Sequence, residues 1–499
     1  MGDRRPPVPA MVDYAIDLEE REGRHGTSRR LWLARLFGRR LRARPADLPG
    51  FDPNAYLATN PDVAATGADP LWHYGTIGWL ENRPVSTTSS TRAYLEAQPR
   101  ARRALLDIQA SRAARDGSPI RAAEPHAGPP RPDILLVGYV EANLGLAEST
   151  RGLARALARH DVPFAIYPYN VAVEDRHIGP FMPERYDRSG HYEVTLFEAN
   201  GDQVPDFLDQ FTPKLGGSHA IFRTYWELAE APRSWARQLA RFDEIWAPTT
   251  FVARAFRKIF DGPITLVPPS VSVERAERLG RADFGLEADR FLVLFTFDYS
   301  SIVERKNPLG LLAAFEAAFP GDDGVGLVFK ATGAPHHAPG TRAALAQAAA
   351  RDPRITVIDE TIARDAVLSL IETCDAYASL HRSEGFGYGL AEALALGRPI
   401  IATDYSGSTD FLSEATGYPV PHRLVRLRDG AYPHGDGQTW ADPDLAAAAA
   451  ILRHMRHDRA DRAARTIAGR RLIEERFGAE AVGRVAAERL RAVLAQRAR

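Results

Sequence analysis

Cysteine is almost absent from this chain of 499 residues, in which Cys374 is the only one. A single cysteine excludes a disulfide within the chain and any metal site built from several cysteines. Because Cys374 lies in the apolar stretch LSLIETCDAYASL, we expect it to be a buried small hydrophobe and not a reactive thiol.

Long apolar runs and an excess of charge are missing as well. No run of about 18 apolar residues occurs, so no membrane-spanning helix is predicted. The N-terminal sequence MGDRRPPVPAMVDYAIDLEE lacks the apolar core of a signal peptide, which predicts a cytoplasmic protein. Lysine and arginine number 63 against 64 acids, so the formal net charge of −1 predicts no nucleic-acid partner.

What remains is the composition of a globular protein. Hydrophobic residues make up 45% of the chain and charged residues 25%, which is typical of globular domains. A chain of this length is expected to divide into two or three domains.

Residues 1–49 combine a start without periodicity, predicted to be disordered, with a basic segment. Within them, residues 28–45 contain seven arginines and no acid, and Trp32, Leu36 and Leu41 recur among these at mostly helical spacing. Two interpretations stay open. The segment is either a helix on the surface of an anionic membrane, giving a peripheral contact at the inner face, or a solvated arginine-rich helix packed on a neighbouring domain.

Residues 50–86 are punctuated by Asx-Pro pairs and aromatic anchors, in the sequence FDPNAYLATNPDVAATGADPLWHYGTIGWLENRP. This pattern resembles a small helical module found beside bacterial glycan-synthesis domains, in which His73 is expected to be a packed residue. Residues 87–131 are rich first in Ser and Thr, then in Ala and Arg, then in Pro, and we interpret them as a helix and a linker.

Alternating strands and helices begin at Asp133. ILLVGYV is a continuous apolar run, as expected of a buried parallel strand, and further strand–helix units follow it. A second series starts at FLVLFTFD, residues 291–298. We therefore predict an α/β fold with two serial, doubly wound Rossmann-like domains facing a cleft, residues 132–280 and 281–475. Residues 476–499 are predicted to form a helix that crosses back over the first domain.

The most informative segment is HRSEGFGYGLAEALALGRPIIATDYSGSTDFL, residues 381–412. Glu384 and Glu392 lie eight positions apart, with a glycine-rich turn after the first. Such a turn frees backbone N–H groups to approach an anion at the start of a helix, here expected near Tyr388. Glu392 would then lie one turn inside this helix, where it can accept hydrogen bonds from ribose hydroxyls. The turn comprises Gly385, Phe386, Gly387, Tyr388 and Gly389.

Arg305 and Lys306 form a second group, on a loop that follows a predicted strand. Arginine can bind a diphosphate in a bidentate manner, and lysine adds a point charge. An Asp-x-Asp at a strand end is not found, since Asp442 and Asp444 are expected in a late loop. The sequence therefore predicts a site that uses no metal and no cofactor.

The two groups together, in this order, resemble the retaining GT-B glycosyltransferases with the E-x7-E signature, a family 4-like group also called glycosyl transferases group 1. The resemblance extends over about residues 132–490. It implies transfer of a hexose from a nucleotide-sugar donor to a glycan or lipid-linked acceptor in polysaccharide biosynthesis. The donor would bind mainly to the second domain and the acceptor mainly to the first, and the anomeric configuration would be retained.

The resemblance also implies roles for individual residues. Arg305 and Lys306 would stabilise the departing nucleoside diphosphate in place of a metal, and Glu384 would contact hexose hydroxyls. Ser406 and Gly407 occupy a turn near the phosphates, where the family usually has glycine in place of Ser406. Gly145 would belong to the N-terminal glycine loop of the cleft, although a glycine after a strand also fits a simple tight turn.

One departure from the family pattern concerns the first domain, where no counterpart of the usual histidine is found. Tyr225 and Glu227 resemble instead the YWE segment of a subgroup, in which we expect Glu227 to contact the acceptor or the donor sugar. The alternative is an aromatic core with a surface acid.

Two other functions compete with glycosyl transfer. A nucleotide-sugar epimerase would need acid and base groups at the sugar, and no suitable set of His and Asp residues is seen. A non-catalytic glycan-binding or scaffold protein would depend on the module at 51–84, but it would not need the clustered charges of Glu384, Arg305 and Lys306.

Overall fold

The computed structural model describes residues 48, 51–60, 63, 70–74, 85–86, 132–169, 178–187, 192–204, 217–334 and 336–498. The basic segment 28–45 and the predicted helix and linker of 87–131 lie outside the described residues. Residues 132–170, 175–204 and 217–499 form one compact unit, and residues 1–131 belong to another.

The described part of the N-terminal module contains two short helices, α3 (Pro53–Thr59) and α5 (Pro70–His73). The side chain of Asp52 caps α3 by accepting hydrogen bonds from two backbone N–H groups. The hydroxyl of Tyr56 lies 2.9 Å from Nδ1 of His73, so both residues belong to the packing of the module.

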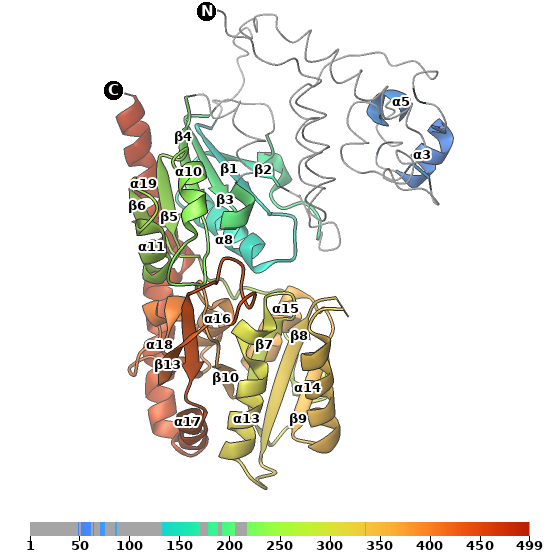
Figure 1. Cartoon of the computed structure of the whole chain (residues 1–499), viewed down its shortest axis with the longest axis vertical. Helices are drawn as coiled ribbons and strands as arrows, with labels where there is room; N and C mark the ends of the chain where they lie inside the picture. Colours follow the sequence, from blue (N-terminus) through green and yellow to red (C-terminus); the bar gives the residue numbers. More distant parts are fainter. Residues whose placement is uncertain are drawn as a thin grey trace, which may run out of the picture. The chain divides into compact units, whose positions relative to one another are not determined.

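The first sheet has six parallel strands in the order β2-β1-β3-β4-β5-β6 (Figure 1). All five residues of β1, β2 and β3 are buried, which explains their continuous apolar sequences. The strands are β1 (Ile134–Gly138), β2 (Phe164–Pro168), β3 (Val194–Glu198), β4 (His219–Arg223), β5 (Glu244–Ala247) and β6 (Ile264–Leu266). The α-helices and 3-10 helices described here are α8 (Gly145–Arg159), α10 (Ala236–Leu239), α11 (Thr250–Arg257), η4 (Pro183–Arg185), η5 (Gly201–Gln203) and η7 (Arg233–Trp235).

The second sheet also has six parallel strands, in the order β12-β11-β10-β7-β8-β9. Its strands are β7 (Phe291–Asp298), β8 (Val325–Thr332), β9 (Ile355–Asp359), β10 (Ala376–Ser379), β11 (Ile400–Thr403) and β12 (Tyr418–Val420). Its helices are α12 (Val303–Lys306), α13 (Pro308–Ala318), α14 (Pro339–Arg351), α15 (Arg364–Thr373), α16 (Tyr388–Ala395), α17 (Leu445–His457), α18 (Arg459–Phe477), η8 (Arg281–Phe284) and η9 (Ser406–Asp410). The predicted α/β fold with two Rossmann-like sheets is confirmed.

An antiparallel hairpin, β13 (His422–Arg426) and β14 (Thr439–Pro443), was not expected. The prediction of a loop around Asp442 is wrong, because Asp442 lies in β14 and forms an ion pair with Arg382 at 2.7 Å. Asp444 caps the N-terminus of α17. The strands are short and carry several charged residues, so they lack the apolar alternation by which strands are recognised.

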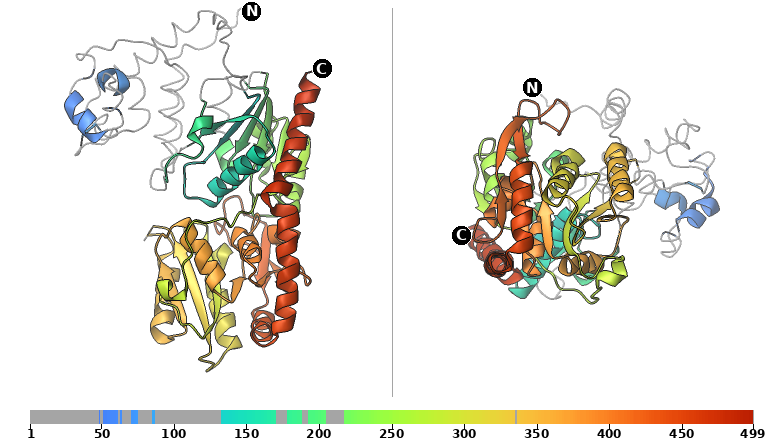
Figure 2. Two further views of the ribbon diagram at one scale, coloured as in Figure 1. Left: turned by 180° about the vertical axis from the view of Figure 1, so that it is seen from behind. Right: turned by 90° about the horizontal axis from the view of Figure 1, so that it is seen from below.

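The last helix, α19 (Ala479–Arg497), belongs to the core of the first sheet although it follows the second sheet in sequence. Val482, Leu490 and Val493 of α19 are buried in one cluster with residues of α8 and β1. Helices α8 and α19 run close together (Figure 2, left). A Cβ added at Gly483 would lie 2.5 Å from the carbonyl oxygen of Ala156, so the glycine allows this approach.

The carboxylate of Glu244 ties α19 to this sheet. Glu244 is fully buried, and Arg489 of α19 donates hydrogen bonds to both of its oxygens at 2.7–3.0 Å. Nε1 of Trp246 also donates to it, at 2.9 Å. Burial alone would raise the pKa of Glu244, but hydrogen bonds from His219, Arg489 and Thr265 lower this pKa to about 2.

Replacing Arg489 with glutamine should therefore destabilise the first domain by about 2 to 4 kcal/mol, because a buried carboxylate loses its strongest partner. Urea unfolding at pH 7, followed by tryptophan fluorescence, would measure the loss of stability. The matched control is Arg470→Gln, which removes an exposed ion pair with Glu474 and should change the stability by less than about 0.5 kcal/mol.

Acid should reduce the difference between the Arg489 variant and the wild type. The stabilisation from Glu244 is complete above its ordinary pKa of 4.5 and is lost as the pH falls toward about 2. Equal stability of the two proteins at pH 7 would contradict the role assigned to Arg489.

Candidate active site

The order of the second sheet reverses between β10 and β7, which lie side by side at its centre (Figure 1). In open α/β sheets, ligands bind outside the carboxyl ends of the strands at such a switch point. The loop after β7 leads to Arg305 and Lys306, and the loop after β10 leads to Glu384. The topology thus brings both groups from the sequence analysis to the same edge.

Arg305 and Lys306 lie on α12, a single helical turn where the sequence predicted a loop. Left-handed residues flank this turn on both sides, Ile302 with φ 56° and Asn307 with φ 56°. This conformation is rare for a β-branched residue such as isoleucine and costs energy, and such strain concentrates at functional sites. The amide of Asn307 donates to the carbonyl of Leu380 at 2.8 Å, which joins the loop after β7 to the loop after β10.

Glu384 forms ion pairs with both cations. One carboxylate oxygen lies 3.0 Å from Nη1 of Arg305 and the other 2.5 Å from Nζ of Lys306. Arg305 is 5% exposed and Glu384 9% exposed, so the three charges are largely removed from water. Burial would raise the pKa of Glu384, but Lys306 and Arg305 outweigh it and hold this pKa at about 2.

Arg305 and Lys306 differ in how many of their hydrogen-bond donors remain available to a ligand. Nη1 of Arg305 donates to the carbonyl of Ser383 at 2.8 Å, and Nη2 donates to the carbonyl of Ser301 at 3.3 Å, so Arg305 fixes both loops. Nζ of Lys306 makes one hydrogen bond, to Glu384, and no other acceptor among the described residues reaches it. Burial lowers the pKa of Lys306. Lys306 therefore carries the donors that are available to a ligand.

The glycine-rich turn allows several backbone segments to meet. A Cβ added at Gly407 would lie 2.2 Å from the carbonyl oxygen of Gly385, and the N–H of Gly407 donates to the carbonyl of Glu384 at 2.8 Å. Gly387 has φ +97° and precedes the first residue of α16. A Cβ at Gly389 would lie 2.0 Å from the hydroxyl of Tyr377. These glycines are needed for close approach at the start of α16.

Ser406 takes part through its hydroxyl. This oxygen accepts a hydrogen bond from the backbone N–H of Glu384 at 2.8 Å and donates to the carbonyl of Tyr405 at 2.6 Å. Ser406 has φ 69°, the conformation that a glycine would adopt without strain. The serine thus keeps the turn and adds a contact to the loop of Glu384.

Two aromatic residues of the turn differ in position. Phe386 is buried in the core, and its ring packs against those of Phe411 and Phe477. Phe386 could therefore face a ligand only through its backbone. Tyr388 is the first residue of α16, with its ring edge-on to that of Phe386.

Glu392 lies within α16, as predicted, but it does not contact Glu384. It is 5% exposed and pairs with Arg364, the first residue of α15, at 2.6 Å. Sequence reasoning did not single out Arg364. It is 28 positions away from Glu392 along the chain, and no motif links the two.

Residues that follow strands of the first sheet meet this group. The hydroxyl of Thr249 donates to the carbonyl of Gly385 at 2.9 Å. The hydroxyl of Ser383 donates to the backbone carbonyl of Glu227. The carboxylate of Glu227 lies 3.8 Å from Arg305, so the structure brings Glu227 to the cluster.

Tyr225 and Gly145 occupy different surroundings. Tyr225 lies against Gly385, and its hydroxyl is 2.6 Å from that of Ser149. Gly145 begins α8, and a Cβ added there would meet nothing within 4 Å, which leaves open space around it.

The tip of the unexpected hairpin, residues 427–438, adds contacts that sequence reasoning missed. The hydroxyl of Tyr432 donates to Glu227 at 2.5 Å, and its ring packs edge-on against Trp226. The side-chain amide of Gln438 bonds both the N–H and the carbonyl of Glu230. In the sequence, Tyr432 between Gly430 and Gly435 is the signal that this tip offers.

Behind Tyr225 lies a buried polar network of the first domain. Arg223 and Glu198 are fully buried and pair at 2.6 Å, and Arg223 also donates to Ser149 at 2.6 Å. Both charged residues end strands of the first sheet, and sequence reasoning did not single them out as a site.

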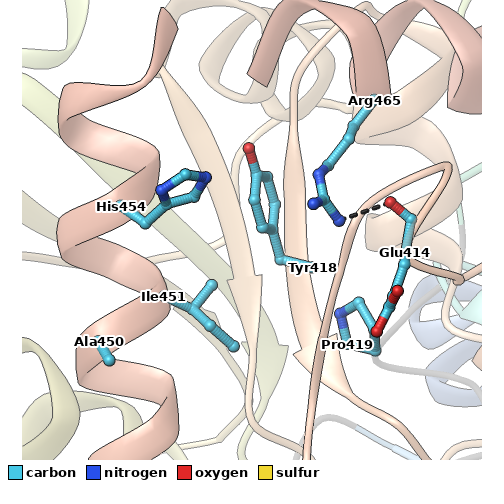
Figure 3. Close-up of a pocket in the computed structure, with 7 residues that line it drawn as sticks. All are labelled: Glu414, Tyr418, Pro419, Ala450, Ile451, His454 and Arg465. Atoms are coloured by element: carbon cyan, nitrogen blue, oxygen red, sulfur yellow. Dashed lines mark hydrogen bonds between the residues drawn. The ribbon is translucent and has the colours of Figure 1, made fainter. Parts of the chain in front are cut away.

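A pocket of about 410 Å³ lies apart from this site, lined by residues of β12, α17 and α18 (Figure 3). Arg465 lies over the ring of Tyr418 and donates to the backbone carbonyl of Glu414. The hydroxyl of Tyr418 donates to Asp461 at 2.7 Å. The polar groups here bind one another, and the pocket shares no lining residue with the candidate site.

In the described part of the chain, no three His, Cys, Asp or Glu side chains come together as ligands for a metal ion. None of the described helices combines the length and the apolar character that are needed to cross a bilayer.

Comparison with known proteins adds a family and a fold. Residues 293–427, which contain Arg305, Lys306, Glu384 and Glu392, match the family described as Glycosyl transferases group 1. No curated protein sequence matches the chain.

Solved structures resemble most of the chain at low sequence identity. Sucrose-phosphate synthase from Thermosynechococcus elongatus superposes with a TM-score of 0.57 at 16% identity, over 73% of this chain and 100% of that one. A glycosyltransferase from Rickettsia africae gives 0.54 at 14% identity, over 73% and 99%. HepE of Anabaena, in complex with UDP-glucose, gives 0.52 at 14% identity, over 72% and 99%. The two Rossmann-like domains of this chain therefore have the GT-B fold.

Proposed function

We propose that the protein is a retaining, metal-independent glycosyltransferase. It moves a hexose from a nucleotide-sugar donor to a glycan or lipid-linked acceptor in polysaccharide biosynthesis. The observation that carries the proposal is the buried cluster of Glu384, Arg305 and Lys306 at the switch point of the second sheet. The family match over 293–427 and the complex of the GT-B protein HepE with UDP-glucose support a nucleotide-sugar donor.

The leaving group of such a transfer is a nucleoside diphosphate, whose negative charge grows as the bond to the sugar breaks. Arg305 and Lys306 face two carboxylates, those of Glu384 and, at 3.8 Å from Arg305, Glu227, so the cluster offers an anion the free N–H donors of Lys306 and not a net positive charge. The unused donors of Lys306 and the positive end of α16 would stabilise the diphosphate, and charges fixed before the reaction are effective for this purpose. The released phosphate oxygen would take the acceptor proton on the same face of the sugar, which gives retention without an enzyme nucleophile.

Glu384 has a second role in this scheme, beside the contact with hexose hydroxyls that the resemblance implied. Both of its oxygens already accept from cations. It would hold Lys306 in place, and the lone pairs that remain on its oxygens would accept hydrogen bonds from hexose hydroxyls.

Thermal unfolding with a panel of UDP-, GDP- and ADP-sugars, with and without EDTA, tests the proposal. One donor should raise the unfolding midpoint and be hydrolysed slowly, and EDTA should not change either result. Ligand at 100 times its Kd stabilises a protein by about 2.7 kcal/mol, which is readily measured. Failure of every donor and free nucleotide to shift the midpoint would refute the proposal. Conversion of the sugar without an acceptor would indicate an epimerase.

Replacing Lys306 with alanine should reduce kcat by about 100- to 1,000-fold, as the loss of one preorganised donor does elsewhere. The fold should persist, because Arg305 still pairs with Glu384. Steady-state kinetics with the donor from the panel would measure the effect. The control is Lys258→Ala, which removes an exposed ion pair with Glu230. A Lys306 variant as active as this control would rule out the assigned role.

Replacing Gly407 with alanine should weaken nucleotide binding by tenfold or more, about 1.4 kcal/mol, because the new methyl group must push the Gly385 backbone away. Titration calorimetry with the nucleoside diphosphate of the active donor would measure the change. Gly340→Ala in α14 is the matched control, since a Cβ there meets nothing within 4 Å. Unchanged affinity in the Gly407 variant would show that this close approach does not shape the binding site.

A further inference from the structure

Glu392 is a buried acid that the described residues satisfy on one side only. It is 5% exposed, and Nη2 of Arg364 donates to its Oε1 at 2.6 Å. Its other oxygen, Oε2, accepts no hydrogen bond from any described residue. Oε2 is not a buried atom without a partner, so it reaches the surface and is an acceptor open to a donor from a ligand.

The position of Arg364 is unfavourable for the helix that carries it. Arg364 is the first residue of α15, where the positive end of the helix dipole repels a cation. Its guanidinium reaches out of α15 to Glu392 on α16, and Nη2 also lies 3.4 Å from the carbonyl of Ser272. The contact with Glu392 is what compensates for this placement.

Arg364 also acts on an acid of the first domain. Glu148 lies in the first turn of α8 and is paired with Arg151 and Arg155. Burial would raise the pKa of Glu148, but positive charges lower it, and the charge of Arg364 is the largest of these. Arg364 therefore lies between a carboxylate that follows a strand of the first sheet and one that follows a strand of the second.

We propose that Arg364 is a positioning residue for the nucleoside of the donor: it orients Glu392 so that Oε2 accepts a hydrogen bond from a ribose hydroxyl. The inference rests on the proposed function and deepens it, because it assigns the orientation of Glu392 to a residue of another helix, Arg364 of α15. Arg364 acts through Glu392 and need not touch the sugar itself.

The chemistry of the pair explains why a cation is required. Carboxylate oxygens accept hydrogen bonds, and a ribose hydroxyl can donate one. With Oε1 fixed by a charge-assisted bond, the rotation of the carboxylate is restricted and Oε2 keeps one direction. A hydrogen bond from a neutral hydroxyl to a charged acceptor contributes about 1.5 to 3 kcal/mol, a factor of about 10 to 100 in affinity.

The test compares ribose and deoxyribose ligands on the full chain. Titration calorimetry would measure the Kd of UDP, GDP and ADP, and then of the 2′-deoxy and 3′-deoxy forms of whichever nucleotide binds. The wild type should bind one deoxy form about 10- to 100-fold more weakly than the ribonucleotide. In Arg364→Gln, the affinity for the ribonucleotide should fall to nearly the affinity for that deoxy form. The ratio of the two Kd values should therefore approach one.

Further variants separate positioning from a loss of structure. Arg364→Lys keeps a cation that can reach Oε1 and should restore part of the discrimination. Glu392→Gln should abolish the discrimination between the ribonucleotide and the deoxynucleotide. Adding Arg364→Gln to that variant should change the Kd of the ribonucleotide little further, because the two residues act as a unit. The control is Arg351→Gln, which removes an exposed ion pair with Glu316 and should leave both Kd values unchanged.

Each adverse outcome has a distinct meaning. If no nucleotide binds the wild type, the proposed function itself fails, and this inference fails with it. The inference is overturned, while the proposed function stands, in either of two cases. The wild type binds the ribonucleotide and both deoxynucleotides with equal Kd, or Arg364→Gln keeps the wild-type ratio of the deoxynucleotide Kd to the ribonucleotide Kd. A fall in affinity that is equal for all forms would show that Arg364 is merely structural.

Discussion

The buried ion pairs of Glu384 with Arg305 and Lys306 set the requirements that the surrounding loops meet. Charges removed from water are tolerated only when their partners are close and well oriented. The loops after β7 and β10 must therefore stay at a fixed separation, and the bond from Asn307 to Leu380 holds them there. Glycines at 385 and 407 allow the second loop to pack onto a third segment. The strained conformation of Ile302 is a cost of presenting both cations from one helical turn.

Charge balance explains why the cluster suits an anionic ligand without being an open cationic patch. Glu384 offsets one of the two positive charges, and Glu227 approaches Arg305 to 3.8 Å. Lys306 keeps N–H donors that no described acceptor uses, and these suit an anion. Glu227 is itself held by Tyr432 from the hairpin tip, so the acid on the first-sheet side is oriented by the second domain. Residues of both sheets thus complete one arrangement, which is consistent with a site that joins two substrates.

Local sequence features anticipated the fold and the residues that cluster, and they failed where contacts depend on distant segments. The apolar runs of β1 and β7 indicated buried parallel strands, and the glycine turn before Tyr388 indicated the start of α16. The hairpin β13–β14 was missed because its short strands carry charges on both sides. Arg364 was missed because an arginine at the start of a helix has no significance until its partner 28 positions away is known. The left-handed conformation of Ile302, which precedes α12, was missed because a β-branched residue rarely adopts it.

The two acids of the E-x7-E segment follow the same physical rule on different parts of the site. Glu384 is held by Arg305 and Lys306 from the loop after β7, and Glu392 is held by Arg364 from the helix after β9. In each case cations from elsewhere in the domain stabilise a buried carboxylate and leave some hydrogen-bonding capacity unused, on Lys306 at one end and on Oε2 of Glu392 at the other. A diphosphate needs donors, and a ribose needs acceptors. In the proposed function, Lys306 would supply donors to the diphosphate and Glu392 would supply an acceptor to the ribose.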